Sequence, residues 1–430
     1  MNRRVAITGM GWVTPLGHDL EYVWQRLLAG ETAMAPITIF DARTYPSQFA
    51  AEVREFDLKT ILGEHYERHK TASRQARFAL AAAEVAWNHA GLNGTGDITP
   101  EMVGVYLGGG EGPIDFDNFM TAAVTGWDPE RRELDSVKWA EVAHERLDAV
   151  REFEQDPNCA AGHLACRFNA QGPNFNTLTA CAASTQALGE ASMLIRRGDA
   201  DIMISGGAHS MIHQLGMTGF NRLTALSTRN DDYKTSSRPF DRTRDGFVLG
   251  EGSGILILEA YENAQRRGAK IHAEIIGYGS TADAFRVTDM HEEGRGPAAA
   301  MRAALHDAGL APADIDYISA HGTSTVENDK IETLAIRKVF GEHAPRTPIS
   351  SVKSMFGHLI AGAGSVELIT CVLAMRDGII PPTVNYQHPD PNCDLDYVPN
   401  QPRKADLKIC LSNSFGFGGQ NNTIIVKKPE

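Results

Sequence analysis

The stretch Asn176-Thr-Leu-Thr-Ala-Cys-Ala-Ala-Ser-Thr185 decides how the rest of the chain is interpreted. It places Cys181 between a β-rich approach and an alanine-rich helix that continues to Arg197. A cysteine in the first turn of a helix faces free backbone N–H groups and the positive end of the helix dipole, and both favour the thiolate. We therefore expect Cys181 to be a nucleophile, although a lone cysteine is more often simply buried.

Outward from this stretch, short β-branched or apolar runs alternate with alanine-rich helical patterns. Strands are expected over residues 5–8, 103–107, 202–205, 255–258 and 317–319, and helices over 72–90, 182–197, 296–308 and 365–375. Such alternation predicts an α/β protein with a largely parallel sheet covered by helices on both faces.

An internal repeat suggests that the chain is duplicated. A helix that ends Ala90-Gly-Leu92 precedes the strand at 103–109, and a helix that ends Ala308-Gly-Leu310 precedes another at 315–322. We expect two similar halves, residues 1–260 and 261–430. Residues 111–162 interrupt this pattern, and we expect an insertion whose charged part, 128–156, forms one exposed helix.

Bulk composition narrows the function. The 430 residues carry a formal net charge of -13, which argues against a nucleic-acid or membrane-surface binder. The six cysteines lack zinc-site spacing and are typical of a reduced, intracellular protein. The N-terminal apolar run is broken by Gly9, Gly11 and Pro15, so it is too short to insert in a membrane. The same glycines resemble the start of a dinucleotide-binding G-x-G-x-x-G motif, but the position of its third glycine is Thr14, which argues against such a site. We expect a cytoplasmic protein.

Three further motifs carry chemistry. Ala320-His-Gly-Thr-Ser-Thr325 places His321 at the end of a strand, where α/β proteins build their sites. Ser350-Ser-Val-Lys-Ser-Met-Phe-Gly-His-Leu-Ile-Ala-Gly-Ala-Gly364 offers Lys353 and His358 just before a small-residue helix. Ser412-Asn-Ser-Phe-Gly-Phe-Gly-Gly-Gln-Asn-Asn422 is dense in glycine, so its backbone N–H groups can approach a ligand closely.

Together these motifs resemble those of the β-ketoacyl-acyl carrier protein (ACP) synthases, condensing enzymes of the thiolase fold. The chain is similar to the elongating 3-oxoacyl-ACP synthases and to the ketosynthase subunits of aromatic polyketide systems, from Arg4 to about Val426. The resemblance implies a duplicated, five-layered α-β-α-β-α fold. It also implies decarboxylating condensation of acyl-ACP with malonyl-ACP, in fatty-acid or specialised lipid elongation.

The resemblance also implies the roles of individual residues. Cys181 would take the acyl group, and His321 and His358 would donate hydrogen bonds to the malonyl thioester oxygen during decarboxylation. Lys353, supported by Glu332, would organise the histidines. The N–H groups of Cys181 and Phe417 would form an oxyanion hole, and the aromatic loop carrying Phe415 and Phe417 would gate access to Cys181.

The partners follow from the same resemblance. An acidic ACP would dock on a local basic patch, steered by charge. The candidates are Arg68, Lys70, Arg74, Arg222, Arg229 and Lys234. We expect a homodimer with no cofactor or metal of its own, because the substrates arrive on the phosphopantetheine of ACP. The 111–162 insertion would lie near the dimer contact and the far end of the acyl pocket.

Three other functions compete with this prediction. A non-catalytic chain-length subunit would resemble the same family but typically lacks the cysteine. A polyketide ketosynthase that works only with such a subunit would keep Cys181 and both histidines. A CoA-dependent thiolase fits less well, because the paired histidines and the glycine-rich C-terminal motif resemble the decarboxylating branch.

Overall fold

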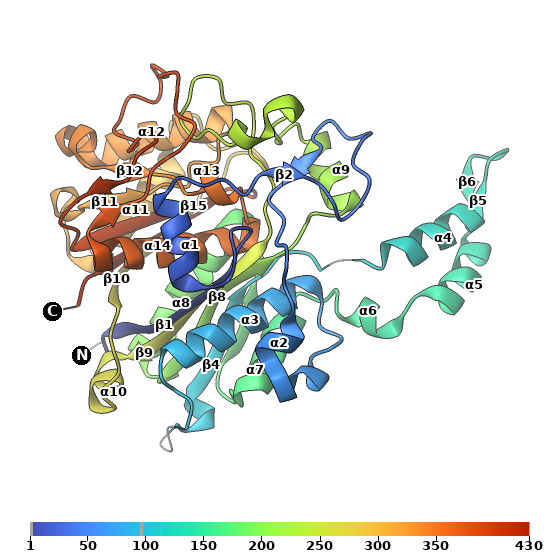
Figure 1. The fold of residues 1–430 in the computed structure, drawn as a ribbon, viewed down its shortest axis with the longest axis horizontal. Helices are drawn as coiled ribbons and strands as arrows, with labels where there is room; N and C mark the ends of the chain where they lie inside the picture. The colour runs from blue at the N-terminus through green and yellow to red at the C-terminus, as the bar shows by residue number, and fades with distance from the viewer. Residues whose placement is uncertain (1–2, 95–97, 113, 430) are drawn as a thin grey trace.

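A ten-stranded sheet forms the centre of the protein in this computed structural model, which describes residues 3–94, 98–112 and 114–429 (Figure 1). Its order is β12-β11-β15-β16-β10-β1-β9-β8-β4-β7. The strands are β1 (Val5–Val13), β4 (Val103–Gly108), β7 (Asn174–Thr177), β8 (Ile202–His209), β9 (Gly252–Ala260), β10 (Ala273–Ala282), β11 (Tyr317–Ser319), β12 (Ile349–Ser350), β15 (Ile409–Gly416) and β16 (Gln420–Lys427).

The sheet consists of two five-stranded halves with the same pattern of directions. From β1 outward, β9 and β8 pair antiparallel, whereas β4 and β7 pair parallel. From β10 outward, β16 and β15 pair antiparallel, whereas β11 and β12 pair parallel. The halves meet where β1 pairs antiparallel with β10.

The prediction of a largely parallel sheet was therefore wrong. The physical reason is clearest at β15 and β16, which a short turn after Gly416 joins as a hairpin. Parallel neighbours need a crossover of a dozen or more residues, and this turn leaves no room for one. The predicted strand and helix positions themselves are confirmed, within a few residues at their ends.

The two five-stranded halves are the two β layers: helices cover the outer face of each half, and two further helices lie between the halves, which gives the α-β-α-β-α order. One outer layer holds α3 (Arg74–His89) and α7 (Cys159–Phe168), and the other holds α11 (Arg295–Ala308) and α12 (Val326–Phe340). The central layer is α8 (Ala183–Arg197) and α14 (Ala363–Asp377), which contact each other and strands of both halves. Residues 363–375 of α14 are all buried, so this helix lies in the core.

Glycines allow the outer helices to lie directly on the strands. A Cβ atom at Gly9 would lie 2.2 Å from the carbonyl oxygen of Ala86 in α3, and one at Gly279 would lie 2.2 Å from that of Ala300 in α11. Glycine is therefore required at both contacts. Strand β1 consequently continues through Gly9 and Gly11 to Val13, beyond the strand expected over residues 5–8.

The remaining elements connect this framework. The short helices and strands are α1 (Leu20–Leu28), α2 (Leu58–Leu62), α9 (Gln214–Arg222), α10 (Tyr261–Arg266), α13 (Lys353–Phe356), β2 (Ala35–Pro36), β3 (Phe49–Ala50), β13 (Ile379–Ile380) and β14 (Arg403–Lys404). The 3₁₀ turns are η1 (Gly63–Arg68), η2 (Pro100–Met102), η3 (Ala180–Ala182), η4 (Asn230–Thr235), η5 (Pro312–Asp314), η6 (Gly341–Arg346) and η7 (Ile360–Gly362). None of the helices among the described residues is long and apolar enough to cross a membrane.

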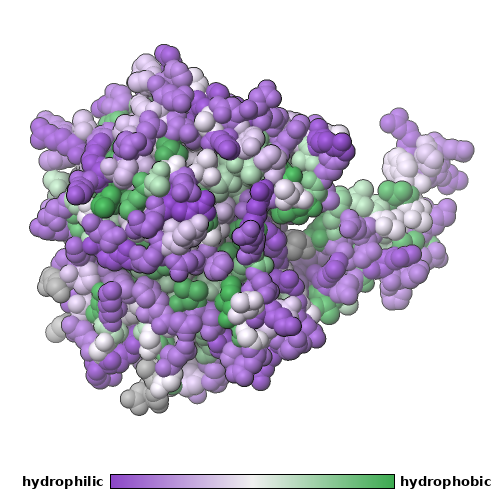
Figure 2. Space-filling view, in the orientation of Figure 1, coloured by the Kyte–Doolittle hydropathy of each residue, from purple (hydrophilic) through white to green (hydrophobic). Residues whose placement is uncertain are grey.

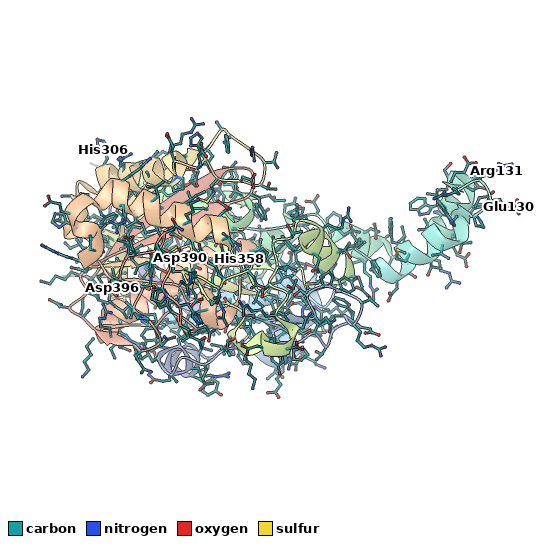
Figure 3. All side chains as sticks on the ribbon, turned by 90° about the horizontal axis from the view of Figure 1, so that it is seen from above. Glu130, Arg131, His306, His358, Asp390 and Asp396 are labelled. Atoms are coloured by element: carbon teal, nitrogen blue, oxygen red, sulfur yellow. The ribbon has the colours of Figure 1, made fainter. Side chains whose placement is uncertain are left out.

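The insertion forms an arm that projects from the body (Figure 1). Its elements are α4 (Phe116–Gly126), β5 (Trp127–Asp128), β6 (Glu133–Leu134), α5 (Ser136–Arg146) and α6 (Ala149–Phe153). Figure 3 shows Glu130 and Arg131 at its tip, and Figure 2 shows apolar side chains along it. The single helix predicted over 128–156 is wrong, because Asp135 and Asp148 each cap a new helix by accepting two backbone N–H bonds.

Candidate active site

Cys181 lies in η3, one turn before α8, and only 5% of it is exposed. Burial raises the pKa of its thiol to about 11, and this outweighs the opposing effects of the Lys353 charge and of the backbone N–H groups of Phe417 and Cys181. The thiolate expected from the helix position alone is therefore wrong for the resting protein, because desolvation favours the neutral thiol.

His321 and His358 flank the sulfur. The three ligand atoms of Cys181, His321 and His358 lie within 4.8 Å of one another, and the two imidazole centres are 5.4 Å apart. Figure 3 shows His358 within the body, far from the arm. Burial lowers the pKa of both imidazoles well below the usual value, so both rings are neutral.

Hydrogen bonds fix which nitrogen of each ring carries the proton. His358 Nδ1 accepts from the backbone N–H of Ile360 at 3.2 Å, so its proton is on Nε2, which has no partner among the described residues. His321 Nδ1 lies 3.4 Å from the Lys353 ammonium, which also assigns its proton to Nε2. Each imidazole therefore offers one N–H donor to a substrate.

Lys353 is paired with a carboxylate that the sequence reasoning missed. Its Nζ donates to the carbonyl oxygen of His321 at 2.7 Å and forms a buried ion pair with Glu367 on α14. Glu332, which we had expected to support Lys353, instead accepts the backbone N–H groups of His321 and Gly322 at 2.9 and 2.8 Å. The expected pairing is thus corrected, because these N–H groups already engage both Glu332 oxygens.

Both carboxyls are buried, and this changes their acidity. Desolvation raises the pKa of Glu332 to about 7, and that of Glu367 to about 7. Glu367 was detectable in principle as the only charged residue in the otherwise uncharged run 363–375. A lone charge in such a run requires a buried partner.

A narrow cavity of about 100 Å³ reaches the cysteine. Its lining comprises Cys181, Phe247, 288–290, His321, Thr323, Thr325, 327–328, His358 and 415–417. The Phe415 ring lies 5.7 Å from that of His321, and Phe247 lies 5.3 Å from His358. Phe415 and Phe417 therefore border the approach to the sulfur, where their gating role stays a prediction.

The predicted docking residues differ in how exposed they are and in whether they form ion pairs. Arg74 forms an ion pair with the fully buried carboxylate of Glu251, while 39% of its own side chain is exposed, so its docking role stays a prediction. Arg229 is half-buried and pairs with Asp245. The remaining candidates are exposed on the surface: Arg68, Lys70, Arg222 and Lys234.

A buried thiol beside two neutral imidazole donors, at the end of a narrow cavity, defines an acyl-transfer site of the covalent kind. The chain matches the β-ketoacyl synthase N-terminal domain over residues 2–264 and the C-terminal domain over 272–387. It belongs to the β-ketoacyl synthase family of condensing enzymes.

Relatives match over the full length. The 3-oxoacyl-[acyl-carrier-protein] synthases 2 of Coxiella burnetii and Synechocystis sp. are 41% and 42% identical, with 99% of this chain and 99% and 98% of theirs covered. A β-ketoacyl synthase structure from Burkholderia phymatum is 32% identical with a TM-score of 0.89. A type II polyketide ketosynthase solved with its acyl-carrier protein is 34% identical with a TM-score of 0.88. Both structures match over 100% of each chain, which confirms the predicted fold class.

Proposed function

We propose that this enzyme condenses acyl-ACP with malonyl-ACP to give 3-oxoacyl-ACP, CO2 and free ACP, through an acyl thioester on Cys181. The observation that carries the proposal is the pair of neutral Nε2–H donors, on His321 and His358, beside the thiol. The relatives named 3-oxoacyl-[acyl-carrier-protein] synthase 2 support the same reaction.

The first half-reaction loads the enzyme. Cys181 Sγ attacks the thioester carbonyl of acyl-ACP, the bond to the phosphopantetheine sulfur breaks, and the thiol proton passes to that leaving sulfur. The N–H groups of Cys181 and Phe417, which act on the sulfur in the resting protein, would hold the oxyanion. Acyl transfer through the protonated thiol thus needs no free thiolate at rest.

The second half-reaction forms the carbon–carbon bond. Malonyl-ACP loses CO2, and the electron pair of the broken bond moves onto the thioester oxygen, where the His321 and His358 N–H groups stabilise the enolate. The enolate carbon attacks the acyl carbonyl, the bond to Cys181 breaks, and the released thiolate takes a proton from solvent. Lys353, held by Glu367, positions His321.

The remaining assignments belong to the same proposal. ACP docks on the exposed basic residues Arg68, Lys70, Arg222 and Lys234, with Arg229 at their margin. Each chain consists of the halves 1–260 and 261–430, and two chains form a cytoplasmic homodimer. A polyketide ketosynthase that needs a chain-length partner is the alternative, since one ketosynthase–chain length factor structure also matches at 33% identity.

Intact-mass spectrometry tests the reaction. The purified protein is mixed with a panel of acyl-ACPs, then chased with malonyl-ACP, beside Cys181→Ala and, as a matched control, Cys166→Ala at an exposed free cysteine. We expect acyl mass on the wild type and on Cys166→Ala but not on Cys181→Ala, and its transfer to 3-oxoacyl-ACP. Acylation of Cys181→Ala would refute the assigned nucleophile, and activity only after a second subunit is added would favour the alternative.

A further inference from the structure

The cavity that reaches Cys181 has an acidic rim at its outer end. Along one wall the exposed fraction increases from 3% at His321 and 6% at Thr323 to the exposed side chain of Glu327. The exposed Asp289 belongs to the same lining. These two carboxylates form the rim at the mouth of the cavity, whereas Cys181 lies at the inner end.

Little positive charge offsets this rim. None of the described residues that line the cavity is a lysine or an arginine. Asp289 is paired at 3.1 Å with Arg286, which is itself exposed. The Glu327 carboxylate forms no ion pair within the described part of the chain, not even with Lys330 on the next turn of α12. Its charge therefore remains available to act on a substrate in the mouth.

Glu327 also has a local role in its helix. It lies in the first turn of α12, where a carboxylate stabilises the positive end of the helix dipole. That role contributes to the stability of the fold and does not depend on what enters the cavity. The effect of Glu327 on stability and its effect on substrates can therefore be measured separately.

The carrier of the acyl group brings negative charge to this rim. When a thioester reaches Cys181, the far end of the pantetheine arm, where the phosphate is attached, lies on the side of the mouth. An ACP presents one phosphodiester charge there, and its protein surface can gain attraction from basic residues elsewhere. A free coenzyme A thioester presents about four negative charges and has no protein surface with which to offset their repulsion.

We propose that Glu327, together with Asp289, forms a charge filter that disfavours thioesters of strongly anionic free carriers, such as coenzyme A. This inference rests on the proposed function and names the class of carrier that the same site accepts. Two like unit charges about 10 Å apart in water lower a rate by about twofold at low salt. A carrier with about four charges should be disfavoured by about five- to tenfold, because its outer phosphates lie further from the rim.

Three thioesters of increasing charge test the filter. The purified protein is given hexanoyl-pantetheine, hexanoyl-phosphopantetheine or hexanoyl-CoA, which share one thioester arm and carry about zero, two and four negative charges. The initial rate of acyl-Cys181 formation is measured by intact mass at low salt. We expect the CoA thioester to react about five- to tenfold more slowly than the pantetheine thioester, and about 1 M salt to remove most of this difference.

Variants assign the effect to the rim. Glu327→Gln should reduce the ratio of the pantetheine rate to the CoA rate by about threefold, and Glu327→Lys should reduce it further. The matched control is Glu130→Gln at the arm tip (Figure 3), which changes the net charge equally and should leave the ratio unchanged. Thermal midpoints are measured alongside, because loss of the helix-end interaction lowers stability without changing the ratio.

The outcomes separate the filter from the reaction itself. Equal rates for the three thioesters, a faster CoA thioester, or a ratio unchanged in both Glu327 variants would overturn the filter while leaving the acylation of Cys181 intact. Acylation by hexanoyl-ACP alone would also overturn it, since free carriers would then be rejected whatever their charge. No acylation of Cys181 by any of the four thioesters would overturn the proposed function, and the filter with it.

Discussion

Replacing Glu367 by Gln should destabilise the protein far more than replacing an exposed glutamate. Both side chains of the Lys353–Glu367 pair are 2% exposed, so the change leaves the lysine ammonium buried beside the carbonyl oxygen of His321. Above about pH 7, where Glu367 is charged, breaking a buried pair by removing one partner costs about 3–5 kcal/mol, and we expect about 3 because the Gln carbonyl can still accept from the lysine.

This free energy converts into a measurable midpoint shift. An unfolding entropy of about 2.1 cal/mol/K per residue gives about 0.9 kcal/mol/K for the 430 residues. Glu367→Gln should therefore lower the thermal midpoint by about 3 °C. The matched control is Glu67→Gln, which breaks the exposed pair with Lys70 and should shift the midpoint by about 1 °C or less.

Differential scanning calorimetry at one scan rate compares the two variants with the wild type. A double variant, Lys353→Met with Glu367→Leu, should be more stable than Glu367→Gln, because it removes both buried charges. If Glu367→Gln shifted the midpoint no more than Glu67→Gln, the reasoning would fail, because the buried pair would then contribute no more than an exposed one.

Three other predictions test burial and packing. The folded pKa of Glu332, about 7, lies above its ordinary 4.5, so its stabilising contribution is complete below about pH 4.5 and lost as pH rises through about 7. As pH rises from about 5 to about 8, the wild type should therefore lose roughly 3 kcal/mol of unfolding free energy that Glu332→Gln keeps. The thermal midpoint of the variant should rise relative to that of the wild type over this range. Iodoacetamide should alkylate the exposed Cys166 before the buried Cys181. The alkylation rate of Cys181 should keep rising with pH towards its pKa of about 11. Reaction of Cys181 before Cys166 at neutral pH would contradict this order. Gly9→Ala should lower the thermal midpoint by about 1–3 °C through overpacking against α3, whereas Gly162→Ala, with open space around it in α7, should not lower it at all.

The sequence predicted those parts of the site that occur as short continuous motifs. Cys181, His321 and His358 each lie in a run of small residues next to an element end, and the structure brings all three together. Element positions were predictable for the same local reason, because alanine-rich helices and β-branched strands differ in period. Strand direction was not, since it depends on how connections cross the sheet.

Features that depend on distant pairing escaped the sequence reasoning. The partner of Lys353 is decided by where α14 crosses the site, and Glu332 was the nearer candidate along the motif. Glu111 and His209 are brought close because β4 pairs with β8. The protonation state of Cys181 was predicted wrongly because the argument used its position at the helix start alone. Burial in the folded protein also desolvates the thiol and raises its pKa.

The place of β1 in the middle of the sheet has a consequence for synthesis on the ribosome. Its neighbours are β9 and β10, so no strand that emerges before residue 252 can pair with it. At about 5–20 residues per second, this hydrophobic strand waits for about 12–50 seconds without its partners. The nascent first half thus has no complete sheet until nearly two-thirds of the chain has been made, and over that interval β1 can bury its side chains only through contacts with earlier elements such as α3.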